Sequence, residues 1–226
     1  GLLAVFTPFL RWIDVFSSRS ADRVLTLSQY NANLIDTIYG IDNICVAYPG
    51  VDLSRFPCPR AIEERGDCFT LLSVGKLHHR KNLELQLRAL RTLVGTYRQI
   101  RLIVVGHGPY FQDLINLSEE MKLSEYVSFV GFVEEKDLPQ YYRCADLFVF
   151  SAFREPFGLV LLEAMSSCLP VVAPNEGGPT DIVINGKTGL LFEQNNIADL
   201  SAKIEFFVTH PKETKEMGKN ARQRAA

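Results

Sequence analysis

The chain has 226 residues, of which 47% are hydrophobic and 22% are charged, and its net charge is −2. This is ordinary composition for a globular protein, and the length suits one large domain or one domain with part of another. The nearly neutral balance gives no electrostatic reason to expect a nucleic acid as partner, so any affinity for anions must come from local basic clusters.

The first stretch, residues 2–13, is apolar but short, and Pro8 and Arg11 interrupt it. No apolar run reaches the roughly 18 residues that a membrane span needs, and no secretory signal is visible. The chain begins with Gly rather than Met and ends at Ala226 within a helical pattern. We therefore expect a sequence that is truncated at both ends.

From residue 22 onward, short β-branched runs alternate with helical patterns. Most of the runs are apolar throughout, as is typical of parallel strands that are buried on both faces. This alternation predicts an α/β fold with a doubly wound, mostly parallel, Rossmann-like sheet. The expected strands are residues 23–27, 44–47, 70–74, 101–105, 127–130, 146–150, 169–173 and 189–192.

Helix signals lie between the expected strands. Ser28 is placed to cap a helix that stops at Gly40. Apolar residues from Leu83 to Val94 recur at helical spacing and predict one buried stripe. The pair at 108–109, Gly-Pro, is expected to open a further helix.

A turn-rich segment at residues 48–52 is the expected domain boundary. Residues 1–50 then form the tail of a preceding domain with its linker, and residues 51–226 form a fairly complete α/β domain. In such sheets ligands bind beyond the carboxyl ends of the strands, so motifs at those positions carry the most weight.

The five cysteines are scattered and form no C-x-x-C pair: Cys45, Cys58, Cys68, Cys144 and Cys168. Odd in number and without a pattern, they favour a reducing compartment, which for this chain means the cytoplasm. They argue against a disulfide framework and against a structural zinc site.

The strongest motif spans residues 154–163 and directly follows an expected strand. Pro156 suits the first turn of a helix, and Gly158 would let a ligand approach the backbone closely. The free N–H groups of that first turn, together with the helix dipole, form an anion site. Glu155 and Glu163 have seven residues between them, and their carboxylates suit the hydroxyl groups of sugar and ribose.

The alternative for this motif is a helix that begins with one acid and carries another on its exposed face. The apolar run from Leu159 to Leu162 favours a buried helix, from which Glu163 would need a partner.

A second motif at residues 74–82 contains Gly75, Lys76 and Lys81 after another strand. The two ammonium groups are placed to neutralise a diphosphate, although a solvated basic loop is the simpler reading.

His78 and His79 in the same loop are expected to face solvent, because no third metal ligand lies at a suitable spacing. The Gly-His-Gly-Pro sequence at 106–109 fails as a dinucleotide fingerprint and is interpreted as a structural turn. Residues 127–133 end a strand in Gly131 and then offer apolar residues to a flat base. A glycine loop at 175–179 follows the next strand and faces the same edge.

Together these motifs resemble the retaining glycosyltransferases of family 4, which have the two-domain GT-B fold. The similarity runs from about residue 21 to the end, and it rests on the Glu-x7-Glu pair, Gly-Lys-Leu with a downstream Lys, Gly-His-Gly-Pro, residues 130–133 and Gly-Gly at 177–178. The resemblance implies that this chain is the C-terminal half, which binds the donor, while an N-terminal domain binds the acceptor.

Carried over by position, the resemblance implies that Lys76 and Lys81 hold the diphosphate and that Glu155 holds the transferred sugar. It assigns the ribose hydroxyls to Glu163. Further donor-binding positions are Gly75 beside the diphosphate, Gly131, Phe132 and Val133 at the base, and Phe157, Gly158, Leu159 and Val160 at the helix start.

The resemblance further implies transfer of a sugar, with retention, from a UDP- or GDP-linked donor to a hydroxyl acceptor, without metal or other cofactor. The acceptor would be a sugar or a lipid-linked glycan, which makes peripheral membrane association of the whole protein an expectation. Two departures are Lys76, where the family more often has Arg, and Asp181, where it usually has Glu. A non-catalytic nucleotide-binding module and a dinucleotide-dependent oxidoreductase are the alternatives.

Overall fold

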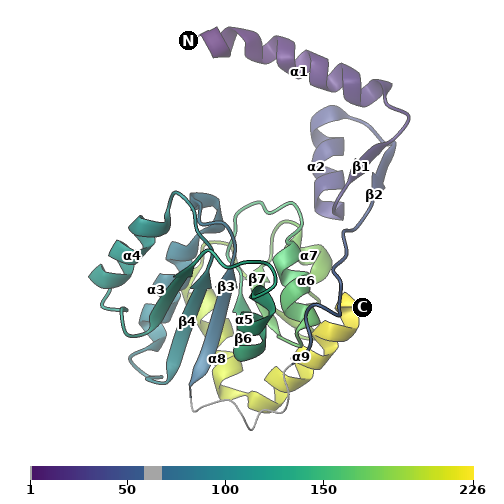
Figure 1. Cartoon of the computed structure of the whole chain (residues 1–226). Coiled ribbons are helices and arrows are strands. Elements are labelled where there is room, and N and C mark those ends of the chain that lie inside the picture. The colour runs from purple at the N-terminus through teal and green to yellow at the C-terminus, as the bar shows by residue number, and fades with distance from the viewer. Residues whose placement is uncertain (1, 59–67) are drawn as a thin grey trace. The chain divides into compact units, whose positions relative to one another are not determined.

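The computed structural model describes residues 2–58 and 68–226, with the side chains of the first helix from Leu10 onward. The chain divides into two compact units, Gly1–Pro49 and Gly50–Ala226 (Figure 1). This division lies one residue from the boundary expected from the sequence.

The first unit consists of α1 (Leu2–Ser20), β1 (Val24–Thr26), α2 (Gln29–Tyr39) and β2 (Ile44–Val46). The two strands pair in parallel. Ser28 caps α2 as predicted, because its side chain accepts a hydrogen bond from the Asn31 N–H at 3.1 Å. Gly40 ends the helix with a φ of 60°. Both helix signals are therefore confirmed.

Large apolar side chains of the first unit remain exposed. Trp12 and Phe16 on α1 are each 60% exposed, and their rings stack on each other. On β1, Leu25 is 69% exposed. A two-stranded sheet offers little surface to bury such residues. This unit therefore presents apolar surface that its own residues do not cover.

The second unit is built on a six-stranded sheet. Its strands are β3 (Phe69–Val74), β4 (Ile100–Val105), β5 (Val127–Gly131), β6 (Leu147–Val149), β7 (Val171–Pro174) and β8 (Gly189–Phe192). All of them were predicted, with ends that shift by at most two residues. Their order is β5-β4-β3-β6-β7-β8, and every pairing is parallel.

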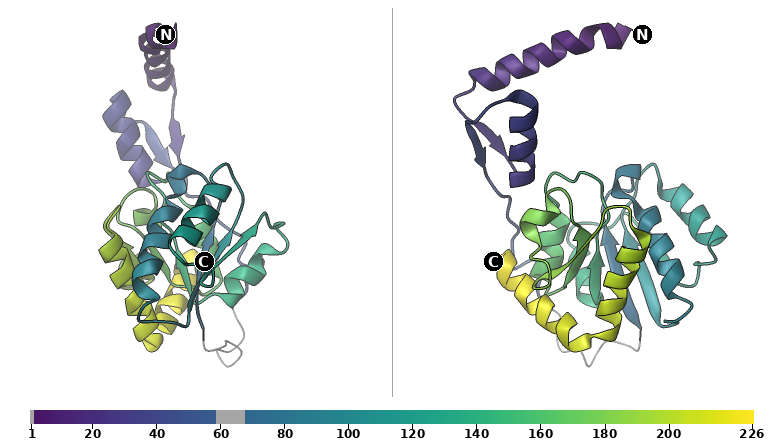
Figure 2. Two further views of the ribbon diagram at one scale, coloured as in Figure 1. Left: turned by 90° about the vertical axis from the view of Figure 1, so that its left-hand side faces the viewer. Right: turned by 180° about the vertical axis from the view of Figure 1, so that it is seen from behind.

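Helices cover both faces of the sheet (Figures 1 and 2). Alternate residues of β3 show the division, since Leu71 belongs to one core cluster and Leu72 to the other. The helices are α3 (Leu83–Leu93), α4 (Phe111–Glu120), α5 (Leu138–Cys144), α6 (Leu159–Ser166), α7 (Pro179–Ile182), α8 (Ile197–Thr209) and α9 (Pro211–Ala225). The first cluster includes residues of α3, α4 and α8, and the second includes residues of α5 and α6.

The strand order places a topological switch point between β3 and β6. From β3 the chain builds outward through β4 and β5, then crosses back to β6 on the other side of β3. Loops that leave the carboxyl ends of these two strands diverge, and ligands of such sheets bind in the crevice between them. The doubly wound fold therefore brings the basic loop after β3 and the acidic loop after β6 to the same place.

Two features of the second unit tie distant segments together. Cys58 and Cys168 form a disulfide across 110 residues of sequence, with 5.1 Å between their Cα atoms. The sequence argues against a disulfide framework, and the cysteine spacing gives no sign of this one bond, because only the fold brings the two cysteines together. Beside this bond, Arg222 of α9 donates hydrogen bonds to the carbonyl oxygens of Phe56 and Ser166.

Candidate functional site

The basic and acidic loops meet across the switch point. Lys81 Nζ lies 2.8 Å from Glu155 Oε2, and the two side chains are 27% and 18% exposed. Lys81 ends a 3-10 turn (η2, His79–Lys81) after β3, whereas Glu155 follows β6. An ammonium has three donors and a carboxylate has two acceptor oxygens, so this pair keeps capacity for a ligand on both sides.

A buried amide fixes the backbone beneath Lys81. Gln86 is 3% exposed, and its Nε2 donates to Ser151 Oγ at 2.8 Å. The Ser151 hydroxyl in turn lies 2.9 Å from the Lys81 carbonyl and 3.0 Å from that of Asn82. Because Ser151 lies in the loop that follows β6, these bonds join the two sides of the switch point. The position of Lys81 is therefore set by the sheet itself.

The glycine loop after β7 holds the backbone of Glu155 in place. The Gly178 N–H donates to the Glu155 carbonyl at 2.8 Å. A Cβ at Gly178 would collide with the backbone of Phe157 and of Pro156. The loop at 175–179 thus lies at the predicted edge, and glycine is required there by close backbone approach.

The helix after the Glu155 loop, α6, begins later than the sequence indicates. Gly158 is its N-cap, with a φ of 106°, and α6 begins at Leu159. Pro156 therefore lies outside the helix, and the prediction that it occupies the first turn was wrong. The positive φ of Gly158 is incompatible with a helical residue, so the turn cannot start before it. The first N–H groups of α6 remain as donors for an anion.

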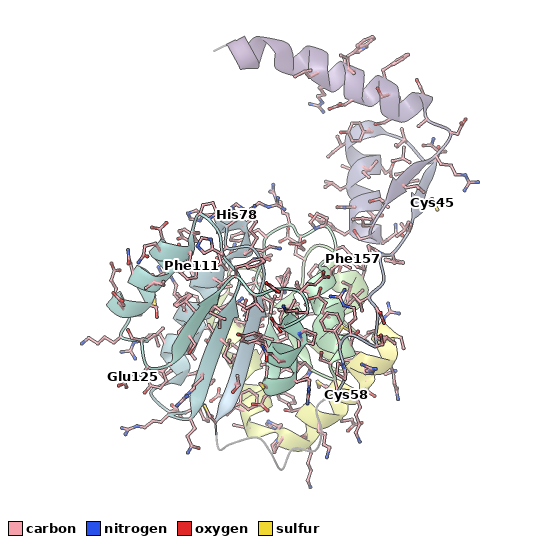
Figure 3. The ribbon with its side chains drawn as sticks, in the orientation of Figure 1. Cys45, Cys58, His78, Phe111, Glu125 and Phe157 are labelled. Atoms are coloured by element: carbon pink, nitrogen blue, oxygen red, sulfur yellow. A yellow bond between two sulfur atoms is a disulfide. The ribbon has the colours of Figure 1, made fainter. Side chains whose placement is uncertain are left out.

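Three further residues of this motif have different surroundings. Phe157 is buried in the second core cluster, Leu159 is 46% exposed and Val160 is partly buried. Figure 3 shows Phe157 and His78 at the carboxyl edge of the sheet, while Glu125 lies toward the opposite edge. The side chain of Phe157 anchors the loop, so only its backbone is available to a ligand.

The second acid, Glu163, is paired with a tyrosine. Tyr142 Oη donates to Glu163 Oε2 at 2.6 Å. Tyr142 is fully buried, and Glu163 is partly buried on the second turn of α6. The alternative of a freely exposed acid on the helix surface is therefore excluded.

Burial sets the ionisation of this second acid. Desolvation raises the pKa of Glu163 above its ordinary value, and the nearby Glu135 charge acts in the same direction. The Tyr142 hydrogen bond and the Arg55 charge lower the pKa and oppose this effect. Arg55 also forms an ion pair with Glu135 at 2.8 Å.

Lys76 lies apart from these pairs. It is exposed on the loop after Gly75, and no ion pair of its ammonium occurs among the residues that the structure describes. The loop is held by Leu77, whose N–H donates to the His107 carbonyl at 3.1 Å and whose carbonyl accepts from Tyr110 at 3.1 Å. The Gly-His-Gly-Pro turn is therefore structural, and α4 begins at Phe111, two residues after Pro109.

The expected base-binding segment ends β5. Gly131 has a φ of 81°, and its carbonyl accepts from the Gly106 N–H at 2.8 Å. Phe132 is 78% exposed, whereas Val133 packs against the second core cluster. The exposed ring is the kind of surface on which a flat heterocycle could stack.

Two of the hollows in the described part of the chain lie at the carboxyl edge of the sheet. A small one is lined by Gly75, Lys81, Gln86 and their neighbours. A polar one of about 500 Å³ is lined by Asn175, Glu176, Leu191, Phe192, Glu193, Gln194 and Asp199. Neither hollow is lined by Gly158 or Glu163. The structure thus joins Lys81 to Glu155, while Glu163 forms its own contacts with Tyr142.

Sequence reasoning missed the residues that hold the charged groups in place. Tyr142, Gln86 and Ser151 carry no motif, and each meets its partner from a distant segment. One signal in the sequence could have indicated them: Glu163 lies on an apolar helix and was therefore expected to have a partner. The two histidines of the basic loop are exposed as expected, and His79 stacks on Tyr110. Among residues 2–58 and 68–226, no cluster of His, Cys, Asp and Glu suits a metal ion.

A family model described as "Glycosyl transferases group 1" matches residues 58–224, which is most of the chain. The chain belongs to this family. Its sheet, with helices on both faces, has the architecture of GT-B glycosyltransferase structures.

Individual relatives agree with this assignment. The chain is 30% identical to a glycogen synthase of Mycobacterium tuberculosis, over 94% of this chain and 51% of that protein. It is 29% identical to human alpha-1,3/1,6-mannosyltransferase ALG2, over 94% of this chain and 56% of that protein. The chain also resembles the structure of Anabaena Alr3699/HepE in complex with UDP and glucose, with a TM-score of 0.85 and 23% identity. The match covers 98% of this chain and 63% of that one. The chain thus spans about half the length of these two sequence relatives.

Within the part of the chain that the structure describes, no helix is both long and apolar enough to cross a bilayer.

Proposed function

We propose that this chain is the donor-binding half of a retaining glycosyltransferase of family 4. In this proposal it binds a UDP- or GDP-linked hexose and contributes to transfer of that sugar to a hydroxyl group. The observation that carries the proposal is the Lys81–Glu155 pair, with its 2.8 Å separation across the switch point. It combines a cation for a diphosphate with a carboxylate for sugar hydroxyls at the usual ligand position of the fold.

The reaction requires stabilisation of the leaving group. The bond between the anomeric carbon and the diphosphate oxygen breaks, and its electron pair stays on the diphosphate. The acceptor oxygen bonds to the same face of that carbon, and its proton passes to the leaving diphosphate. Lys81 and the N–H groups at the start of α6 stabilise the growing negative charge, with Lys76 added from the exposed loop. Glu155 orients the sugar, and Glu163 binds ribose hydroxyls.

The remaining half of the site is proposed to come from an acceptor-binding domain. The first unit supports this, because Leu25 and Trp12 leave apolar surface that such a domain could cover. The acceptor class would be a sugar or a lipid-linked glycan, with peripheral membrane association of the whole protein. We propose a cytoplasmic location and a reaction without metal or other cofactor. Because a reducing cytoplasm disfavours disulfides, labelling of the Cys58 and Cys168 thiols in cell fractions tests the location: free thiols are expected in the cytoplasm, and an intact disulfide in the cell would contradict this part of the proposal.

A thermal-shift panel tests donor binding directly. A ligand that binds only the folded state raises the melting temperature, by an amount that grows with its affinity. We expect UDP- or GDP-sugars to raise the melting temperature of the wild-type chain, and we expect ADP-sugars or NAD to raise it less. Lys81→Ala should abolish the shift, while Lys215→Ala, an exposed lysine of α9, should leave it intact. A larger shift with NAD than with UDP or GDP would overturn the proposal.

A further inference from the structure

Tyr142 stands out because it is a large polar residue with no solvent access. It is 0% exposed, and its ring packs edge-on against Phe56 at 5.6 Å and tilted against Phe148 at 5.7 Å between centroids. Phe148 is part of the central strand β6, so this packing fixes the ring relative to the sheet. A tyrosine confined in this way has its hydroxyl at one place.

At that place the hydroxyl has a single acceptor among the described residues, Glu163 Oε2. Glu163 projects from α6, whose Ala164 and Met165 are fully buried in the same core. Two rigid elements therefore hold both ends of a 2.6 Å hydrogen bond. The second carboxylate oxygen, Oε1, has no hydrogen-bond partner among the residues that the structure describes. The carboxylate thus has one oxygen fixed and one oxygen available.

We propose that Tyr142 is a positioning residue for ribonucleotide recognition: its hydroxyl orients the Glu163 carboxylate so that the free oxygen accepts hydrogen bonds from vicinal ribose hydroxyls. This inference rests on the proposed function and deepens it, because it names the residue that prepares the carboxylate and the ligand feature that it serves. The ligand class is a ribonucleoside diphosphate, in preference to its 2′-deoxy or 3′-deoxy form.

The same hydrogen bond controls the charge on Glu163. Burial raises the pKa of this carboxyl, and donation by Tyr142 lowers it. The other charged groups that act on it are Arg55, which lowers the pKa, and Glu135, which raises it. Loss of the Tyr142 hydroxyl therefore raises the pKa of Glu163 further. A protonated Glu163 is a poorer acceptor, so the effect on nucleotide affinity grows as pH falls.

The experiment is a calorimetric titration of the 226-residue chain with UDP and with GDP between about pH 5 and about pH 8, where an ordinary Glu stays ionised. At about pH 8 we expect Tyr142→Phe to weaken nucleotide binding about three- to tenfold, on the scale of one hydrogen bond. The loss of affinity should increase as the pH falls toward about 5. Tyr141→Phe is the matched control, because this neighbouring tyrosine is half-buried and the hydrogen bond to Glu163 comes from Tyr142 instead.

Glu163→Gln separates positioning from simple loss of stability. In this background there is no carboxyl to titrate, so adding Tyr142→Phe should produce no further pH-dependent change. The titration of the nucleotide's own phosphate is common to all variants and cancels in the comparison. The 2′-deoxy and 3′-deoxy diphosphates should bind wild type and Tyr142→Phe equally weakly. A Tyr142→Phe loss that is independent of pH, or that persists in the Glu163→Gln background, would overturn the inference.

A second readout needs no nucleotide. The carbon-13 shift of the Glu163 carboxyl against pH should have its midpoint at higher pH in Tyr142→Phe than in wild type. An unchanged midpoint would refute the role of Tyr142. If neither UDP nor GDP binds wild type, the proposed function fails, while this measurement still decides whether Tyr142 controls Glu163.

Discussion

The two acids of the Glu-x7-Glu motif are held in opposite ways. Glu155 lies on a loop, is 18% exposed and pairs with a cation, Lys81. Glu163 lies on a buried helix and pairs with a neutral hydroxyl, Tyr142. A charged partner can be shared with an incoming anion, whereas a packed tyrosine stays where it is. Under the proposed function, this difference suits the first acid to the reacting end of the ligand and the second to an end that is bound unchanged.

Removal of the cation should have the largest effect. In the full-length enzyme, Lys81→Ala should lower kcat by about 10²–10³, because one preorganised charge at the leaving group is lost. Folding should be nearly unaffected, as a melting curve would verify. Lys215→Ala serves as the control. Normal turnover of Lys81→Ala would show that the Lys81–Glu155 ion pair has no role in transfer.

The backbone under the first acid offers a test that leaves both carboxylates in place. Gly178→Ala should destabilise the chain by about 1–3 kcal/mol, because the added Cβ meets the backbone of Phe157. Gly95→Ala is the control, since nothing lies within 4 Å of a Cβ there. Chemical denaturation measures both. If Gly178→Ala weakened sugar binding but not UDP binding, the division between the two acids would be sharpened.

The second acid should show a conflict between stability and binding. Because burial raises the pKa of Glu163, the folded chain holds this proton more tightly than the unfolded chain, and wild-type stability falls as pH rises through the window above the ordinary Glu value. Glu163→Gln should therefore melt above wild type at neutral pH, and the difference should vanish in acid. Nucleotide affinity should fall on the order of tenfold. A lower melting temperature at neutral pH would contradict the assignment.

A double-mutant cycle on Lys81 and Glu155, each replaced by Ala, should give the smallest effect. The pair is partly solvated, so its coupling in unfolding free energy should be about 1 kcal/mol or less. Coupling in kcat should be much larger if both groups act on one ligand. A large stability coupling with additive kinetics would reverse the comparison and make Lys81–Glu155 the structural pair.

The sequence predicted the scaffold of this site well. Runs such as 102–105 and 169–173 are apolar throughout because both faces of each strand are covered, and this pattern needs no tertiary information. The switch-point rule then placed Lys81 and Glu155 at one sheet edge, although 74 residues separate them. Their direct ion pair was not predicted, since side-chain direction depends on the loops.

What the sequence concealed is the packing around the charges. Tyr142 lies in a short helix with no periodic signal, and its contact with Glu163 depends on how two helices meet over the sheet. Pro156 suited a helix start by composition, but the positive φ of Gly158 moves that start to Leu159. Cys58 and Cys168 become neighbours only through the fold. The roles of the two acids, retention and the nature of the donor remain predictions.

The hydrogen bonds of Arg222 have a practical consequence for anyone who trims this protein. The guanidinium joins α9 to the segment at Phe56 and to the last turn of the helix that carries Glu163. Phe56 in turn lies against Tyr142. A shortened version that lacks α9 should therefore loosen the contacts around Tyr142 and Glu163. Versions for crystallisation or screening should retain Pro211–Ala225.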